Sequence, residues 1–370
     1  MASFLKNKIN QRIQSNSLRT LKIASDLIDF SSNDYLGFAK SDDLKKLIES
    51  YLTQFPNYDV GATGSRLIAG NSLFVEELES KIAQIHQAEC GLIFNSGYDA
   101  NIGLLSSIAQ RGDTIITDEL IHASLIDGAR LSNANKYIFK HNDLNSLEEK
   151  LKNSKGNIFI VTESVFSMDG DFSPLKDLSI LAKKYNAYLI VDEAHATGVI
   201  GEKGLGLVQA LGLQNEVFAR IHTFGKGLGC HGAIVLGSSD LRTFLINFAR
   251  SFIYTTALPF HSLLSIKMAY QLLAITNSIQ KLQSNIQFFK SSAKAQKINF
   301  IESDSAIQCL VISGNHACKA IAAIIQSAGF EVKAILNPTV PLGKERLRIC
   351  LHAQHTQQQM NDLLIKLKEA

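Results

Sequence analysis

The sequence predicts an α/β protein with a mostly parallel sheet flanked by helices, followed by a smaller α+β domain. From about residue 74 to residue 240, helical periodicity alternates with short apolar strands, which is typical of parallel βαβ units. Beyond residue 240 the pattern changes to long helices, and then to two strand-like runs around one helix. We therefore expect an N-terminal helix-and-strand segment at residues 1–45, a large domain at residues 46–245 and a small C-terminal domain at residues 246–370.

Local periodicity predicts the individual elements in order. Ile9, Ile13 and Leu18 fall roughly on one side of residues 1–22, which predicts a polar amphipathic helix, and residues 29–37 predict a short strand that runs into a turn. Strands of the large domain are expected at residues 91–94, 114–117, 158–162, 188–191, 220–224 and 233–236, with helices at residues 74–88 and 98–110. Further helices are expected at residues 241–251, 261–290 and 317–328, and further strands at residues 306–313 and 346–351.

Composition narrows the class of protein. The chain has 46% apolar and 19% charged residues and a net charge of +3, which is typical of a globular protein and too mild to indicate nucleic-acid binding. Its five cysteines show no C-x-x-C spacing, so we expect reduced thiols in a cytoplasmic protein. Neither a secretory leader nor an uncharged apolar run of membrane-spanning length is evident in the sequence.

Two short segments carry the strongest chemical signal. Asp192-Glu193-Ala194-His195 follows the apolar run of residues 188–191, so its acid and its imidazole are expected at the carboxyl end of a buried strand. Lys226 stands among glycines after the strand of residues 220–224, where the backbone can approach a ligand closely. An acid, a His and an isolated Lys at strand ends are what a pyridoxal phosphate (PLP) site requires. The Lys binds the cofactor covalently, the acid pairs with the pyridinium nitrogen, and the His holds the ring or its phenolic oxygen.

Other strand ends offer groups for the rest of such a cofactor. Ser96-Gly97-Tyr98 forms a small-residue turn before a helix, whose N–H groups suit a phosphate, although an ordinary N-cap has the same pattern. Thr223 could add a hydroxyl to that phosphate, and His122 could stack on the ring or be a capped surface residue. Glu163 and Ser167 follow the strand of residues 158–162 and could support these groups.

A carboxylate site is a candidate in the small domain. Arg346 and Arg348 alternate with apolar residues, so they share one face of the expected strand. A bidentate Arg is the natural partner of an amino acid carboxylate. A solvated strand edge would explain the same pattern equally well.

Three other motifs do not support a function. The run Gly227–Gly232 fits G-x-G-x-x-G, but it precedes a strand where a dinucleotide site would open a helix. The acid-to-His segment also fits a helicase DEAH box, yet the chain has no G-x-x-x-x-G-K-[ST] run. His86 and Cys90 make at most half of a metal site, so no metal is expected.

Taken together, the segments resemble the α-oxoamine synthases, fold-type I PLP enzymes that condense an amino acid with an acyl thioester. The matching segments run in order over nearly the whole chain: Phe30-Ser31-Ser32-Asn33-Asp34-Tyr35-Leu36-Gly37, Gly64-Ser65-Arg66, Ser96-Gly97-Tyr98, His122-Ala123-Ser124-Leu125, Phe166-Ser167-Met168-Asp169-Gly170-Asp171, Asp192-Glu193-Ala194-His195, Thr223-Phe224-Gly225-Lys226-Gly227, Ile253-Tyr254-Thr255-Thr256 and Arg346-Leu347-Arg348. The resemblance implies the fold-type I transferase architecture, in which a mostly parallel seven-stranded sheet carries the cofactor.

The resemblance also assigns roles to residues of this chain. It implies that Lys226 is the cofactor lysine and the base for the Cα proton, that Asp192 and His195 contact the pyridine nitrogen and phenolic oxygen, and that His122 stacks on the ring. The remaining implied contacts are Ser96, Gly97, Tyr98, Ser167 and Thr223 to the cofactor, Thr255 or Thr256 to the phosphate of a neighbouring subunit in a homodimer, and Arg19, Asn33, Thr339 and Arg348 to substrate.

Within the family, three segments favour the member of biotin biosynthesis, which joins L-alanine to a pimeloyl thioester with loss of CO2 and release of the thiol. They are Ala196-Thr197-Gly198-Val199, His141-Asn142-Asp143 and Pro338-Thr339-Val340-Pro341. The thioester would arrive on coenzyme A or on acyl carrier protein. Leu336 stands where such members can carry an Arg, which leaves the acyl chain open. The alternatives are the glycine-using and serine-using members of the family, and a non-catalytic binding protein of the same fold.

Overall fold

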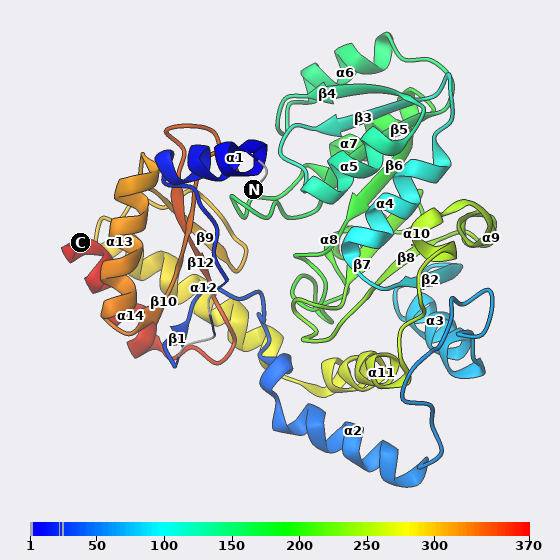
Figure 1. Cartoon of the computed structure of the whole chain (residues 1–370), viewed down its shortest axis with the longest axis horizontal. Coiled ribbons are helices and arrows are strands. Elements are labelled where there is room, and N and C mark those ends of the chain that lie inside the picture. The colour runs from blue at the N-terminus through cyan, green and yellow to red at the C-terminus, as the bar shows by residue number, and fades with distance from the viewer. Residues whose placement is uncertain (1–2, 22, 24–25) are drawn as a thin grey trace. The chain divides into compact units, whose positions relative to one another are not determined.

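The structure is a computed structural model that describes residues 3–21, 23 and 26–370 (Figure 1). The chain divides into two compact units. The larger unit comprises residues 36–166 and 172–279, and the smaller unit comprises the N-terminal residues up to 35, residues 167–171 and residues 280–370.

This division differs from the boundaries expected at 45/46 and 245/246. Residues 246–279 group with the larger unit, because helices α10 (Arg250–Ile253) and α11 (Phe260–Ile275) pack on its α4 (Gly97–Ile108) and on its α2 (Asp42–Gln54). The N-terminal segment groups with the C-terminal part of the chain, because β1 (Ile28–Asp29) pairs with β10 (Phe330–Glu331).

The larger unit is built on a seven-stranded sheet with the strand order β2-β8-β7-β6-β5-β3-β4. Its strands are β2 (Cys90–Phe94), β3 (Thr114–Asp118), β4 (Asn135–Phe139), β5 (Ile158–Glu163), β6 (Tyr188–Asp192), β7 (Ala219–Thr223) and β8 (Ala233–Gly237). Neighbours from β4 to β7 pair in parallel, and β8 runs antiparallel to both β7 and β2. The prediction of a mostly parallel sheet is therefore confirmed.

Strand β4 is the one strand of this sheet that the sequence pattern did not predict. Four of its five residues are exposed, because it lies at the edge of the sheet beside β3 alone. An exposed edge strand lacks the apolar run by which the buried strands were found.

Helices cover the sheet and bury the main core. Besides α2, α4, α10 and α11, the larger unit contains α3 (Leu73–Ile85), α5 (Ala123–Leu131), α6 (Leu144–Lys152), α7 (Leu175–Lys184), α8 (Leu207–Ala210), α9 (Ser239–Phe248) and a short 3-10 turn at Phe38–Lys40. Leu104 of α4, Leu125 of α5 and Leu245 of α9 join Ile115 and Ile221 of the strands in one buried cluster. This packing fixes the helix starts that follow β2 and β3, where predicted site residues lie.

The long helix expected at residues 261–290 is two helices. Helix α11 ends at Ile275, and α12 (Ser278–Ala295) begins after Thr276 and Asn277. The Thr276 hydroxyl accepts a hydrogen bond from the Ser278 amide at 3.1 Å. This side-chain contact gives the backbone an alternative to continuing the helix.

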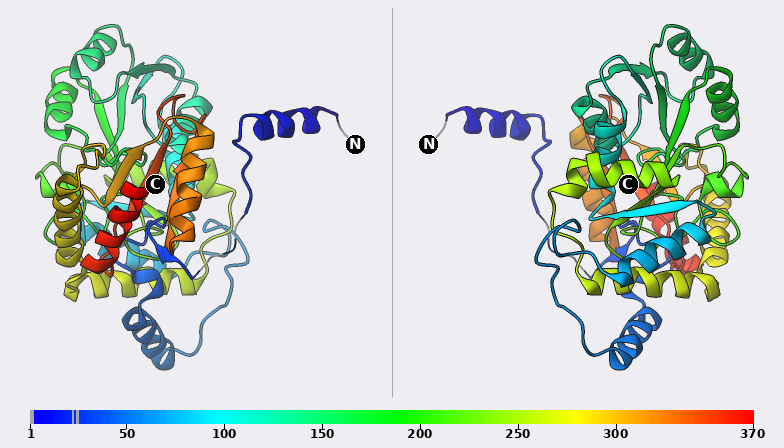
Figure 2. Two further views of the ribbon diagram at one scale, coloured as in Figure 1. Left: turned by 90° about the vertical axis from the view of Figure 1, so that its left-hand side faces the viewer. Right: turned by 90° about the vertical axis from the view of Figure 1, so that its right-hand side faces the viewer.

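The smaller unit has a three-stranded antiparallel sheet and a short parallel pair. The sheet order is β11 (Lys333–Ile335), β12 (Arg346–Cys350), β9 (Ile307–Val311), and β1 pairs with β10. Helices α13 (Asn315–Ser327) and α14 (Gln357–Glu369) lie side by side (Figures 1 and 2).

The N-terminal helix is shorter than expected. Helix α1 covers Ser3–Gln14 of the predicted residues 1–22, of which residues 1, 2 and 22 lie outside the described part. Ile9 and Ile13 are exposed, so the helix contributes no core. Among the described residues, no helix has the length and apolarity needed to cross a membrane.

Candidate active site

Lys226 and His195 meet beyond the carboxyl ends of two neighbouring strands. Lys226 lies in the connection between β7 and β8, and His195 follows β6. The Lys226 Nζ atom is 2.8 Å from His195 Nε2. Gly229 in the same connection has φ +61°, and a Cβ there would collide with the backbone of Ala39, so this turn requires glycine. The structure therefore brings the predicted lysine and histidine into direct contact.

Asp192 is a buried carboxylate at the end of β6. Its side chain is 5% exposed. One oxygen accepts a hydrogen bond from Asn101 Nδ2 at 2.8 Å, and the other accepts one from the Ala194 amide at 2.9 Å. Both donors are uncharged, whereas a buried carboxylate is normally balanced by a cation. The site is thus suited to a cationic ligand group such as a protonated pyridine.

Asn101 and Ser124 connect Asp192 to His122. The second hydrogen of Asn101 Nδ2 reaches Ser124 Oγ at 2.9 Å, and Ser124 Oγ lies 2.7 Å from His122 Nδ1. The Ser124 amide also donates to His122 Nδ1 at 3.2 Å, so this nitrogen is an acceptor. The proton of the neutral ring is therefore on Nε2. His122 caps helix α5, and this fixes the plane of its ring.

A second buried carboxylate, Glu163, lies beside Asp192. The two residues are register partners of β5 and β6. The Glu163 side chain accepts a hydrogen bond from the His122 amide. Burial, and then the nearby charge of Asp192, raises the pKa of Glu163 to about 8. Glu163 therefore holds a proton at neutral pH.

The start of α4 forms a cradle of the kind that holds phosphate. Ser96 caps the helix by accepting a hydrogen bond from the Asp99 amide at 3.1 Å, and the first amides of a helix have no partner within it. A Cβ on Gly97 would lie 2.5 Å from Thr223 Oγ1. A larger residue at position 97 would therefore displace the Thr223 hydroxyl. The Tyr98 hydroxyl donates to Asp127 at 2.7 Å, which directs this side chain to α5.

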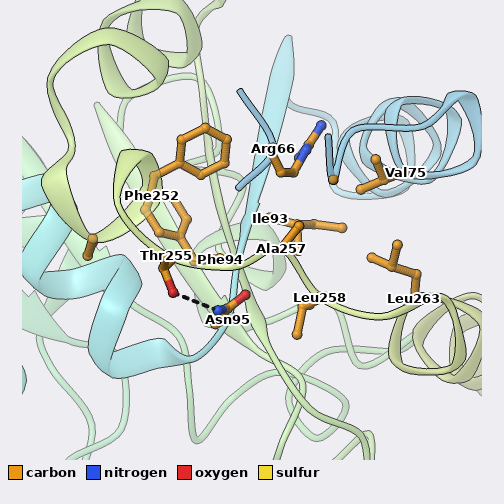
Figure 3. A pocket seen from close by; sticks show the side chains of 12 residues that line it. Arg66, Val75, Ile93, Phe94, Asn95, Phe252, Thr255, Ala257, Leu258 and Leu263 are labelled. Atoms are coloured by element: carbon orange, nitrogen blue, oxygen red, sulfur yellow. Dashed lines mark hydrogen bonds between the residues drawn. The ribbon is translucent and has the colours of Figure 1, made fainter. Parts of the chain in front are cut away.

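Thr255 and Thr256 lie next to the strand end of β2. Asn95 Nδ2 donates to Thr255 Oγ1 at 3.1 Å and to the Thr256 carbonyl at 2.8 Å. Figure 3 shows the small cavity beside this pair, which is lined mainly by apolar side chains such as Phe252 and Leu263. Arg66 at its border is paired with Glu76 and Glu79. Thr255 lines this cavity, whereas Asp192 and Lys226 are not among its lining residues.

In the smaller unit, Arg348 is held by uncharged groups. Its Nε donates to the Ser167 carbonyl at 2.7 Å, one terminal nitrogen to Asn33 Oδ1 at 3.0 Å, and the other to Cys350 Sγ at 2.9 Å. Arg348 is 7% exposed. It also forms a hydrogen bond with the Tyr35 side chain, and a buried cation of this kind favours a carboxylate ligand.

The other predicted substrate residues and the second strand arginine have different surroundings. Arg19 donates to Thr339 Oγ1 at 3.1 Å, so this pair is brought together. Arg346 forms an ion pair with Asp169. Both strand arginines are buried, so the solvated strand edge considered from the sequence is wrong.

The larger unit therefore fits PLP on its own residues. A glycine-dependent cradle, a buried carboxylate with uncharged partners and a lysine lie at neighbouring strand ends. Sequence reasoning did not predict the links through Asn101 and Ser124 or the proton held by Glu163. The one available signal for Asn101 was a polar residue inside the apolar helix run 100–105.

Comparison with known families agrees with this geometry. A family model described as aminotransferase class I and II matches residues 25–367. Among curated proteins, the chain is 43% identical to the 8-amino-7-oxononanoate synthase of Emericella nidulans, over 92% of this chain and 89% of the relative. It is 37% identical to the Marinobacter nauticus protein of the same name, over 100% of this chain and 96% of the relative.

Solved structures of related proteins have the same fold. The 8-amino-7-oxononanoate synthase of Francisella tularensis superposes with a TM-score of 0.78 at 29% identity, covering 93% of this chain and 97% of that one. A serine palmitoyltransferase variant from S. paucimobilis, with bound PLP-myriocin aldimine, superposes with a TM-score of 0.89 at 25% identity, covering 99% and 96%.

Proposed function

Because the chain belongs to the aminotransferase class I and II family, we propose that it is a PLP-dependent acyltransferase with the activity of its 8-amino-7-oxononanoate synthase relatives. The reaction joins L-alanine to a pimeloyl thioester, on coenzyme A or acyl carrier protein, and yields 8-amino-7-oxononanoate, CO2 and the thiol. Identity of 37–43% to relatives of this name over nearly the whole chain supports the choice of member.

The larger unit provides the cofactor-binding residues. The amides of Gly97 and Tyr98, with the hydroxyl of Thr223, hold the phosphate, and Ser96 caps the helix that presents these amides. Asp192 holds the pyridine nitrogen, and His122 stacks on the ring. When bound, the cofactor supplies an electron sink for a carbanion at the amino acid Cα.

Lys226 and His195 handle the proton at the reacting carbon. Lys226 would hold the cofactor and would accept the Cα proton at Nζ. His195 Nε2, 2.8 Å from that atom, orients the lysine and holds the phenolic oxygen. The network from Asn101 to His122 keeps the ring contacts in place.

Substrate recognition uses residues of the smaller unit. Arg348 binds the alanine carboxylate, and Asn33 and Ser167 fix its guanidinium. Arg19 and Thr339, already in contact, bind substrate as a pair.

The observation that carries the proposal is the contact between Lys226 and His195 beside Asp192. To test the proposal, the purified holoprotein is incubated with alanine, glycine or serine, each together with pimeloyl-CoA, acetyl-CoA or palmitoyl-CoA. Release of the thiol is measured. We expect thiol release with alanine and pimeloyl-CoA. The Lys226→Ala variant should release no thiol. Lys226→Arg, which should still fold, is the control for folding. Preference for glycine with acetyl-CoA, or for serine with palmitoyl-CoA, would assign the chain to another family member, and activity retained by Lys226→Ala would refute the mechanism.

The active site is shared in a homodimer, in which Thr255 or Thr256 reaches the phosphate of the neighbouring subunit. Supporting this, Val60, Ile68 and Leu73 are large apolar side chains that are each at least 75% exposed. Co-expression of Lys226→Ala with Thr255→Val, or with Thr256→Val, tests the sharing. If a threonine serves the partner, mixed dimers regain one intact site of two, or about a quarter of wild-type activity at equal expression. No recovery with either threonine variant would contradict sharing.

A further inference from the structure

A buried polar cluster includes residues of the two segments that carry His195 and Lys226. It contains His222 of β7, Thr197 of the turn after β6, and His86 at the end of α3, none of them more than 1% exposed. The His86 and His222 rings are 4.2 Å apart between centroids. The reaction proposed above does not use these side chains.

The hydrogen bond between Thr197 and His222 has a defined direction. Thr197 Oγ1 donates to the Glu193 carbonyl at 2.8 Å and lies 2.9 Å from His222 Nδ1. A hydroxyl has one hydrogen to donate, so His222 Nδ1 must donate to Thr197. Burial, followed by the charges of His86 and Arg220, lowers the pKa of His222 well below its usual value, so the ring is neutral and Nε2 carries no proton.

This bond ties together the two segments that carry the chemistry. Thr197 follows His195 by two residues, and His222 precedes Lys226 by four. The Thr197 turn is held at its start by the Glu193 carbonyl and at its side by His222. We propose that His222, through Thr197, is a positioning residue that sets the contact of His195 with Lys226.

The inference rests on the proposed function, and the test separates the two. Wild-type holoprotein must first show the visible absorbance of lysine-bound PLP; its absence would refute the function and not the positioning role. The variants are His222→Leu, which removes the donor, and Thr197→Val, which keeps the volume and removes the hydroxyl. His222→Asn keeps a donor near the Nδ1 position and is the rescue variant. Tyr270→Phe is the matched control, because its hydroxyl bonds His86 at the far side of the same cluster.

The readout is the pH midpoint at which the visible absorbance changes, measured with kcat/KM and the thermal midpoint. The loss of one hydrogen bond predicts a displacement of about 0.5–1 pH unit and a roughly three- to tenfold fall in kcat/KM for His222→Leu and for Thr197→Val. The His222→Leu/Thr197→Val double variant should show no larger displacement of the pH midpoint and no larger fall in kcat/KM than either single variant. His222→Asn should restore the pH midpoint.

Tyr270→Phe should lower only the thermal midpoint. If His222→Leu does not fold, Thr197→Val tests the same bond from its other end. An unchanged pH midpoint in folded variants that are merely less stable would show a structural role alone and overturn the inference.

Discussion

The glycine at the start of α4 offers a sharp test of the phosphate cradle. Replacing Gly97 with Ala adds one methyl group, which would lie 2.5 Å from Thr223 Oγ1. The backbone does not oppose the change, since Gly97 is not among the residues with positive φ and Ala favours a helix. The consequence should therefore be confined to the cradle.

The clash is with the end of the Thr223 side chain, which can rotate away at little cost to the folded apoprotein. Because the rotated hydroxyl no longer reaches the phosphate, PLP loses one hydrogen bond to a charged group, about 1.5–3 kcal/mol, and the dissociation constant should rise about 10- to 150-fold. Titration of the apoprotein with PLP, followed by visible absorbance, measures this. Thermal stability of the apoprotein should stay close to that of the wild type.

A second substitution shows whether the effect passes through Thr223. Thr223→Ala removes the clashing oxygen, so the Gly97→Ala/Thr223→Ala double variant should bind PLP at least as tightly as Gly97→Ala alone. Wild-type affinity in Gly97→Ala would refute the cradle. Strictly additive losses in the double variant would refute the role of the clash.

Three further outcomes are expected. Glu163 has a pKa of about 8 in the folded state and 4.5 in the unfolded state, so the wild-type apoprotein should lose stability as the pH rises from about 5 to 8. In urea melts, Glu163→Gln should flatten this pH dependence of the free energy of unfolding. An unchanged slope contradicts this. Asn101→Ala should weaken PLP binding about tenfold or more, because it removes the hydrogen-bond donor to Asp192. Ser107→Ala on the same helix is the control and should not weaken binding, because the Ser107 hydroxyl bonds only helix carbonyls. Equal PLP affinities of the two variants would rule out a role for the bond from Asn101 to Asp192. Arg348→Lys should raise KM for the amino acid about tenfold or more with an unchanged PLP spectrum, since Lys lacks the planar fork; an unchanged KM would remove Arg348 from substrate binding.

The strand-end chemistry was predictable because it depends on local sequence. Asp192 follows an apolar strand directly, and Lys226 stands in a glycine-rich turn, so their positions at one edge of the sheet follow from βαβ geometry. Contacts between distant segments were not predictable in this way. The bond from Asn101 to Asp192 joins residues 91 positions apart, and no local pattern of residue types specifies such a partner.

The errors at element level have similar causes. Strand β4 was missed because an exposed edge strand carries no apolar run. The break between α11 and α12 was missed because apolar residues continue on both sides of it, although Thr276-Asn277-Ser278 are residue types that favour helix boundaries. The domain boundary differs because residues 260–275 pack on the larger unit, which depends on tertiary contacts and not on composition.

The reversed strand β8 determines when this sheet can be completed during synthesis. β8 pairs with β2 on one side and β7 on the other, and Cys90 is the register partner of Gly237. β2 therefore has no neighbour in the sheet until residues 233–237 have left the ribosome. Until then the apolar strand Cys90–Phe94 is an unpaired edge on which nascent chains can associate. The turn that carries Lys226 is fixed in the same late step, so cofactor uptake should mark chains whose sheet is complete.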